Sequence, residues 1–238
     1  HYCYVVHSGM LTYPMVQLAQ IVYQDPDLWD HPSFEGKTLL EWADNFVAAA
    51  QQVVTTHEHQ WVDGPVANQG YYIFDSNAMF LPYAGQDLPI NQQNAMGRTL
   101  VALWETTGDA EYLDKAKRLA RYLKSRLTLD DQGAYVWSYW EPSYYPPGED
   151  ISHAAINADF IRLCHLSQIV FDEQDMQRLA TTFFQHIYVH EGTFSDSVGG
   201  GSTNGTSYKP QVGRWVALAP WNPAIYTSVR TTFDQDHS

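Results

Sequence analysis

Apolar side chains recur at intervals of three and four residues along most of this sequence, in six long segments. This interval places the apolar residues on one face of an α-helix, and strand-like alternation is confined to short stretches. A weaker seventh segment follows Trp215, where Pro220 and Pro223 interrupt it. No apolar run is long enough to span a bilayer. The pattern predicts a mostly helical fold with little sheet, with helices over about 12–24, 38–57, 89–107, 110–127, 151–170 and 173–189.

The connections between these segments alternate between short and long. Gly108-Asp109 joins the third segment to the fourth, and Phe171-Asp172 joins the fifth to the sixth. Connections this short make the two helices antiparallel neighbours. The long connections cover about 58–88, 128–150 and 190–213. When such hairpins stack side by side, the long connections lie at one end, and we expect the mouth of a site there.

The two hairpins with short turns look like copies of one unit. A shift of 63 positions aligns three pairs of residues: Asn94 with Asn157, Leu103 with Leu166, and Asp109 with Asp172. Repeated helical hairpins stack because none of them buries its apolar face alone. We therefore expect an all-α fold of repeated antiparallel helical hairpins. Chance similarity between amphipathic helices is the alternative explanation of the match.

Composition favours one folded domain with an acidic surface. The 238 residues are 45% hydrophobic and 17% charged, which suits a single domain over 1–238 with a flexible glycine-rich loop at about 195–213. Its 13 Lys and Arg against 27 Asp and Glu give a net charge of −14, so we expect neither nucleic acid nor a membrane as a partner. Cys3 and Cys164 are too few for a disulfide framework. The start at His1, without a visible signal peptide, suggests a processed or truncated chain and leaves the compartment open.

Aromatic side chains are abundant, with 8 Trp, 16 Tyr and 10 Phe, and many fall between the helices. Aromatic residues in loops often form flat amphipathic surfaces for a ligand. We expect four of them to stack on a sugar, and the two tyrosines among them are also candidates for proton transfer. These residues are Trp137, Tyr139, Trp140 and Tyr144. Carboxylates of the same loop, Glu141, Glu149 and Asp150, offer an acid–base pair, with simple solvation as the alternative.

The start of the fifth segment carries the strongest group of polar residues. Asp150 or Ser152 can cap the helix. His153 and Asn157 are four residues apart and therefore lie on one helical face. A histidine near a helix start, in an aromatic-rich mouth, is well placed for proton transfer. The alternative is that His153 only holds the loop through a hydrogen bond to a neighbouring carbonyl.

The equivalent helix of the other hairpin offers Asn91, Asn94 and Arg98 at matching intervals. An arginine in an otherwise apolar hairpin needs a partner, which is either a substrate carboxylate or a structural Asp or Glu. His7, just before the first segment, could point into the same cavity. The sequence has no glycine-rich dinucleotide motif, no nucleophile elbow and no helix with paired metal-binding histidines. We therefore expect no cofactor and no metal.

Two stretches resemble the α/α-toroid carbohydrate-active proteins, which include six- and seven-hairpin glycosidases, polysaccharide lyases and uronyl C5-epimerases. One stretch is the hairpin turn 106–116, Thr-Thr-Gly-Asp-Ala-Glu-Tyr-Leu-Asp-Lys-Ala, and the other is 149–154, Glu-Asp-Ile-Ser-His-Ala, which opens an inner helix. The resemblance covers about 10–230 and implies a complete or partial toroid that binds an oligo- or polysaccharide at its mouth. In the lyases of this group, Tyr or His abstracts a proton next to a uronate while Asn or Arg neutralises the carboxylate.

The resemblance implies a polyuronide lyase or C5-epimerase, with His153, Tyr139, Tyr144 or Glu149 in proton transfer. Asn157, Asn94, Arg98, Trp137, Trp140 and His7 would then bind the substrate. A glycoside hydrolase with paired carboxylates is the alternative, and a non-catalytic sugar-binding or protein-interaction scaffold is the third. The chain is short for six hairpins and acidic where lyases often carry a basic cleft.

Overall fold

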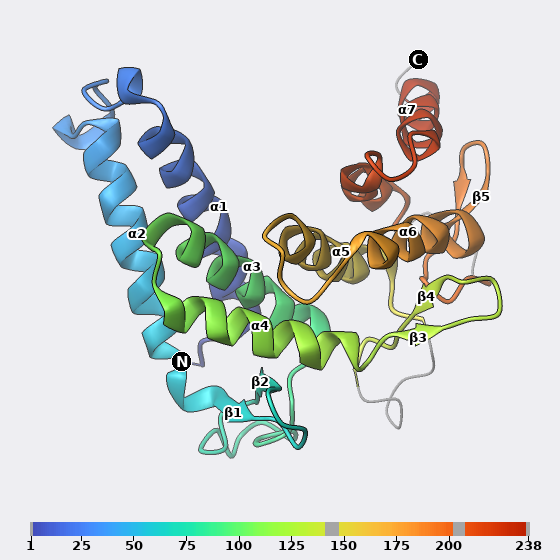
Figure 1. The fold of residues 1–238 in the computed structure, drawn as a ribbon, viewed down its shortest axis with the longest axis horizontal. Helices are drawn as coiled ribbons and strands as arrows, with labels where there is room; N and C mark the ends of the chain where they lie inside the picture. Colours follow the sequence, from blue (N-terminus) through green and yellow to red (C-terminus); the bar gives the residue numbers. More distant parts are fainter. Residues whose placement is uncertain (1, 141–147, 202–207, 237–238) are drawn as a thin grey trace. The chain divides into compact units, whose positions relative to one another are not determined.

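The computed structural model describes residues 2–140, 148–201 and 208–236, and most of them are helical (Figure 1). This confirms the predicted fold class of antiparallel helical hairpins. The long helices are α1 (Val5–Gln24), α2 (Leu39–Thr56), α3 (Ile90–Thr107), α4 (Ala110–Lys124), α5 (Ile151–Leu166), α6 (Glu173–Thr182) and α7 (Ala224–Asp236). The sheets in the described part are three antiparallel pairs: β1 (Trp61–Asp63) with β2 (Gly70–Tyr72), β3 (Thr128–Leu129) with β4 (Tyr135–Val136), and β5 (Tyr188–His190) with β6 (Thr193–Phe194).

The chain divides into two compact units. Unit 1 comprises His1–Leu88 and Gln92–Tyr122, and unit 2 comprises Pro89–Asn91 and Leu123–Ser238. Unit 1 therefore holds the first hairpin and nearly all of the second, and unit 2 holds the third. The single toroid domain over 1–238 stays a prediction.

Local sequence signals explain where most helices begin and turn. In unit 1, the Thr38 hydroxyl accepts from the Glu41 backbone and the Glu41 carboxylate accepts from the Thr38 backbone, so a capping box starts α2. Gly108 has a φ of 72° between α3 and α4, a conformation that residues with a Cβ rarely adopt. In unit 2, Asp172 and Asp175 form the same kind of capping box at α6.

Helix α1 begins seven residues earlier than predicted and contains Pro14 in its interior. Thr12 and Pro14 fit the predicted start near residue 12, because proline is most common in the first helical turn. The helix instead extends back to Val5, which is buried, and Tyr4 at its N-cap makes no side-chain cap bond. Packing of the apolar face therefore outweighs the local signal. A Cβ on Gly9 would lie 2.3 Å from the carbonyl carbon of Ala95, which shows how closely α1 packs against α3.

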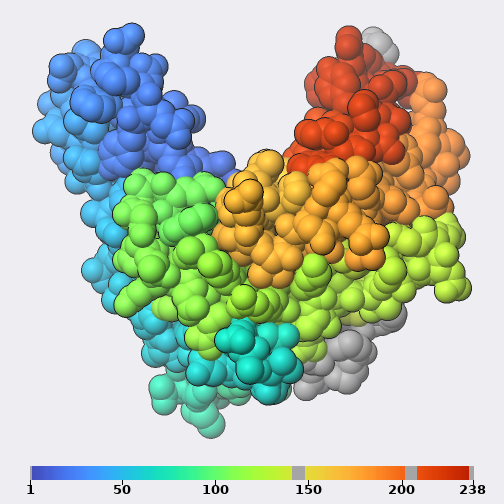
Figure 2. Space-filling view, in the orientation of Figure 1, coloured from blue at the N-terminus to red at the C-terminus, as the bar shows by residue number. Residues whose placement is uncertain are grey.

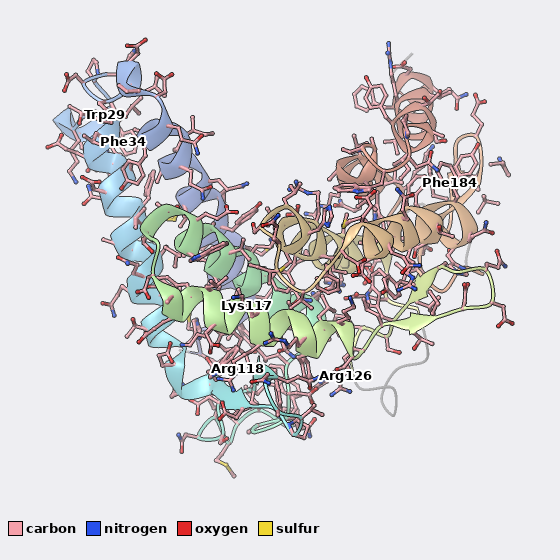
Figure 3. The ribbon with its side chains drawn as sticks, viewed as in Figure 1. Trp29, Phe34, Lys117, Arg118, Arg126 and Phe184 are labelled. Atoms are coloured by element: carbon pink, nitrogen blue, oxygen red, sulfur yellow. The ribbon has the colours of Figure 1, made fainter. Side chains whose placement is uncertain are left out.

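The connection between α2 and α3 forms one end of unit 1, coloured cyan to teal in Figure 2. Basic residues of α4 hold it in place. Arg118 is paired with Asp63 and donates to the carbonyl of Gln69 at 3.1 Å, and in Figure 3 it lies between α4 and the β1–β2 hairpin. Lys115 is paired with Glu58. The cations of α4 therefore serve mainly to fix this connection.

Unit 2 is built around large buried side chains from several elements. Phe160 of α5, Met176 of α6 and Phe183 of the π-helix η4 (Phe183–Ile187) are fully buried. Trp215 of the 3-10 helix η5 (Lys209–Leu218) is also buried, and its indole nitrogen donates to the carbonyl of Ile151 at 3.1 Å. This contact fixes the first residue of α5, where the candidate site begins.

The 63-residue repeat holds at the residue that precedes the second helix of each hairpin. Asp109 directly precedes α4, and its equivalent Asp172 directly precedes α6. The equivalence fails in packing, because Leu103 is 0% exposed whereas Leu166 is 59% exposed. The connections differ as well, because 108–109 joins α3 to α4 whereas 167–172 joins α5 to α6. The two-residue connection predicted at Phe171-Asp172 is therefore wrong, since α5 ends at Leu166.

Candidate functional site

The candidate site lies in unit 2, where the chain enters α5. The amides of Gly148 and Glu149 both donate to the carbonyl of Trp137, at 3.0 and 3.1 Å. On the other side, the amide of Ile151 donates to the carbonyl of Asp196 at 2.8 Å, and the amide of Val198 donates to that of Glu149 at 2.9 Å. The backbone before α5 is therefore held between two segments that are distant in sequence.

Gly148 is favoured first by its backbone conformation and then by the limited space around it. Its φ is 112°, and a Cβ there would lie 2.3 Å from the hydroxyl of Ser197. Ser197 belongs to the expected flexible loop of about 195–213, and it forms an isolated bridge with Asp150. Residues 196–199 of that loop thus lie against the start of α5, and 202–207 lie outside the described residues.

Glu149 is 0% exposed, and its environment favours the protonated form of the carboxyl. Its Oε2 accepts from the indole nitrogen of Trp137 and from the amide of Asn157, both at 2.5 Å. Burial raises the pKa of Glu149 well above its ordinary value, and the two hydrogen bonds oppose this only in part. Because both contacts on Oε2 are donors, we place the proton on Oε1, which has no hydrogen-bond partner among the described residues.

Asp150 and His153 form an accessible pair beside Glu149. Oδ1 of Asp150 accepts from the amides of Ser152 and His153, as expected of a helix cap, and Oδ2 lies 2.5 Å from Nδ1 of His153. Partial burial pushes the pKa of Asp150 upward, but the hydrogen bonds from His153 and the backbone outweigh it and lower the pKa. The His153 side chain is 43% exposed. Asp150 thus orients a histidine whose Nε2 is left for proton transfer.

Asn157 is four residues from His153, as predicted, but the two side chains have different surroundings. Asn157 is fully buried and donates to Glu149, whereas His153 is paired with Asp150 near the surface. The four-residue interval places the two on one stripe of α5 without placing them at one depth. In this structure Asn157 contacts the buried carboxyl.

The aromatic residues of the preceding loop differ in accessibility. The Tyr139 ring lies 5.3 Å from the His153 ring, and both Tyr139 and Trp140 are partly exposed. Trp137 is only 2% exposed, so its ring faces packed side chains rather than a sugar. The other two candidates, Glu141 and Tyr144, lie outside the described residues.

Three further candidates belong to unit 1. Asn94 is buried on α3, and His7 is exposed on α1, with its ring 5.6 Å from the Tyr4 ring. The Arg98 guanidinium lies 4.7 Å from the centroid of the Tyr13 ring, a cation–π contact, and Nη2 lies 2.9 Å from the sulfur of Met10. These contacts place an aromatic ring and a thioether beside Arg98, and the expected acidic partner or substrate carboxylate stays a prediction.

One polar network in unit 1 was missed by sequence analysis. The Ser8 hydroxyl lies 2.8 Å from Nε2 of the buried His57, whose Nδ1 lies 2.6 Å from Oε1 of Gln60. Burial lowers the pKa of His57, and the Gln60 hydrogen bond opposes this in part. Ser8 and His57 are 49 residues apart, so no short motif could have linked them.

Among the described residues, no three or more His, Cys, Asp or Glu side chains are arranged to hold a metal ion. Within the same ranges, none of the helices is both long and apolar enough to cross a membrane.

Comparison with solved structures supports the fold. The chain is similar to a GH76 alpha-mannanase of Bacteroides thetaiotaomicron, with a TM-score of 0.62 and 14% sequence identity. The similarity covers 96% of this chain and 59% of that protein, so the chain spans somewhat more than half of its length. No protein-family model and no curated protein matches the sequence.

Proposed function

We propose that this chain is a carbohydrate-active domain that hydrolyses a glycosidic bond in a polysaccharide, with its site at the start of α5. Protonated Glu149 is the proton donor, and the Asp150–His153 pair is the proton acceptor that activates water. The observation that carries the proposal is the opposite pKa shift of two adjacent carboxyls, raised for Glu149 and lowered for Asp150. Glycosidases need one carboxyl that keeps its proton and a second group that accepts one.

The surroundings of Glu149 fit a proton donor. Its pKa is raised first by burial, so it remains protonated at a pH where exposed glutamates are ionised. The contacts from Trp137 and Asn157 hold Oε2 and leave the proton on Oε1. Since Glu149 is fully buried, transfer to a leaving group requires the adjacent side chains to open when substrate binds.

Two observations favour hydrolysis over elimination next to a uronate. The similar solved protein is an alpha-mannanase. Asn157, which we expected to neutralise a uronate carboxylate, donates to Glu149 and is fully buried. Elimination remains the second candidate because the Asp150–His153 pair could also abstract a proton next to a carboxylate.

The test compares Glu149→Gln and His153→Ala on neutral polysaccharides, including α-mannan, and on polyuronides. Hydrolysis releases reducing ends without a new ultraviolet absorbance, whereas elimination creates a double bond that absorbs. We expect reducing ends from a neutral substrate and about a hundredfold loss in each variant. His190→Ala, an exposed histidine of β5 in the same unit, is the matched control and should keep full activity.

The outcomes separate the candidates. Full activity in Glu149→Gln would remove the acid role of Glu149. Ultraviolet-absorbing products from a polyuronide, lost in His153→Ala, would establish elimination instead. Absence of turnover on every substrate by the wild-type chain would refute the enzymatic proposal.

A further inference from the structure

A group of aromatic side chains lies at the N-terminal end of α1 in unit 1, and the proposed catalysis does not use it. We call it the Tyr2 surface and define it as Tyr2, Tyr4, His7, Met79 and Phe80. The Tyr2 ring meets the Tyr4 ring at 4.7 Å and the Phe80 ring at 6.0 Å, both edge to face, and His7 extends the group beyond Tyr4. Phe80 is 72% exposed and Met79 is 83% exposed.

This exposure is built into the fold. Phe74 and Ala78, on the α2–α3 connection just before Met79, are buried, and Phe74 packs against Tyr83 at 4.2 Å. The amide of Leu81 donates to the carbonyl of Ala78 at 2.8 Å, which closes a turn around the exposed pair. The two apolar side chains are thus presented by an anchored turn. Contiguous exposed apolar groups on a folded protein usually mark a binding surface.

Tyr2 is also fixed in place. Its hydroxyl accepts from the side-chain amide of Gln60 at 3.0 Å and from the backbone amide of Asp75 at 3.1 Å. Gln60 is itself held by His57, at 2.6 Å, within the buried network described above. A ring that is ordered before binding loses little conformational entropy when a ligand stacks on it.

The chemistry around the Tyr2 surface fits a saccharide. Tyrosine and phenylalanine faces stack on the apolar faces of sugar rings. Polar groups lie beside these rings. Oδ2 of Asp75 lies 3.4 Å from Nε2 of the exposed His59, and His7 is also exposed. A purely apolar partner would leave these polar groups without compensation.

The charge of this region selects neutral sugars. Within 1–97 the sequence has one basic residue, Lys37, which lies over the Trp42 ring in the α1–α2 connection, near the other end of the hairpin. The Tyr2 surface itself includes no lysine or arginine to pair with a uronate carboxylate, and Asp75 adds negative charge. Lys115 and Arg118 of α4, which reach the same connection, are already paired with Glu58 and Asp63.

We infer that the Tyr2 surface is a binding site for neutral oligosaccharides on unit 1, in addition to the site at α5. The inference deepens the proposed function, since both concern a saccharide, but it concerns binding and does not need turnover. Unit 1 would hold a neutral chain by stacking on Phe80 and Tyr2 while His59 and Asp75 bind its hydroxyls.

The test measures binding of neutral and uronate oligosaccharides by calorimetry in the Glu149→Gln background, so that the ligand is not consumed. Phe80→Ala removes an exposed ring and should leave the fold intact. We expect it to weaken neutral oligosaccharide binding about tenfold, as loss of one stacked ring does. The matched control is Phe34→Ala. Phe34 is 59% exposed and lies near the other end of the α1–α2 hairpin (Figure 3), so its removal should leave affinity unchanged.

Equal affinity in the Phe80→Ala and Phe34→Ala variants would overturn the inference, as would tighter binding of uronates than of neutral oligosaccharides. Self-association that depends on Phe80, without saccharide binding, would assign the surface to a protein contact instead. Failure of catalysis is a separate outcome. If the wild-type chain binds neutral oligosaccharides but does not cleave them, the binding site at the Tyr2 surface is supported and only the hydrolytic proposal is refuted.

Discussion

Glu149→Gln is expected to flatten the pH dependence of stability. In the folded chain the carboxyl is fully buried, and burial raises its pKa above that of the same side chain in the unfolded chain. Above the ordinary pKa of 4.5, the unfolded chain releases this proton while the folded chain keeps it. The free energy of unfolding then falls with rising pH, and the fall stops at the raised folded pKa.

The magnitude follows from this linkage. One proton retained only in the folded state lowers the free energy of unfolding by about 1.4 kcal/mol for each pH unit. Glutamine does not titrate, so this contribution vanishes in the variant. As the pH rises from about 5 to about 6, the wild-type chain should therefore lose stability relative to Glu149→Gln, on the order of 1 kcal/mol. The amide oxygen can still accept from Trp137 and Asn157.

The assay is urea unfolding at the two pH values, followed by near-ultraviolet circular dichroism. Glu191→Gln provides the control, because Glu191 is exposed and its removal should leave the pH profile parallel to that of the wild type. Parallel profiles for wild type and Glu149→Gln would refute the reasoning, since Glu149 would then be ionised in the folded chain.

Three further substitutions test other parts of the fold by urea unfolding and proteolysis. Gly9→Ala should destabilise the chain by about 3 kcal/mol, because its Cβ would lie 2.3 Å from the carbonyl carbon of Ala95; an unchanged midpoint would contradict this packing. Arg118→Ala should cost about 1 kcal/mol and speed cleavage within 63–70, and equal cleavage rates would show that Arg118 does not anchor this loop. Asp150→Ala should lower the free energy of unfolding by about 1 kcal/mol at neutral pH, because the helix cap is lost. This difference should vanish as the pH falls through the lowered pKa of Asp150. A difference that persists in acid would show that the ionised carboxylate is not what stabilises the helix.

Sequence could predict the elements whose ends carry their own signals. The apolar interval and the turn at Gly108-Asp109 placed α2, α3 and α4 within a few residues of the observed bounds, and the structure shows a capping box at Thr38. Helix α1 has no such signal, because Tyr4 makes no side-chain cap, so its start depends on burial of Val5 in the folded unit. Burial in the folded state is a tertiary property that local periodicity does not contain.

In the candidate site, likewise, only the contacts between residues that are close in sequence were predictable. Asp150 and His153 are three residues apart on one helix, so their contact follows from the helical repeat. The contact between Glu149 and Trp137 closes a loop of twelve residues, and no periodicity requires it. The depth of Asn157 depends likewise on what packs above α5, which explains why its amide meets a buried carboxyl instead of the surface.

The alternation of short and long connections affects how such a chain can change over time. Doubling the length of a flexible connection raises the entropy cost of closing it by only about 0.6 kcal/mol. The two-residue turn at Gly108 has no such latitude, because its φ of 72° sets the direction of α4. Insertions and substitutions can therefore accumulate in the α2–α3 connection and before α5 while the helical hairpins persist.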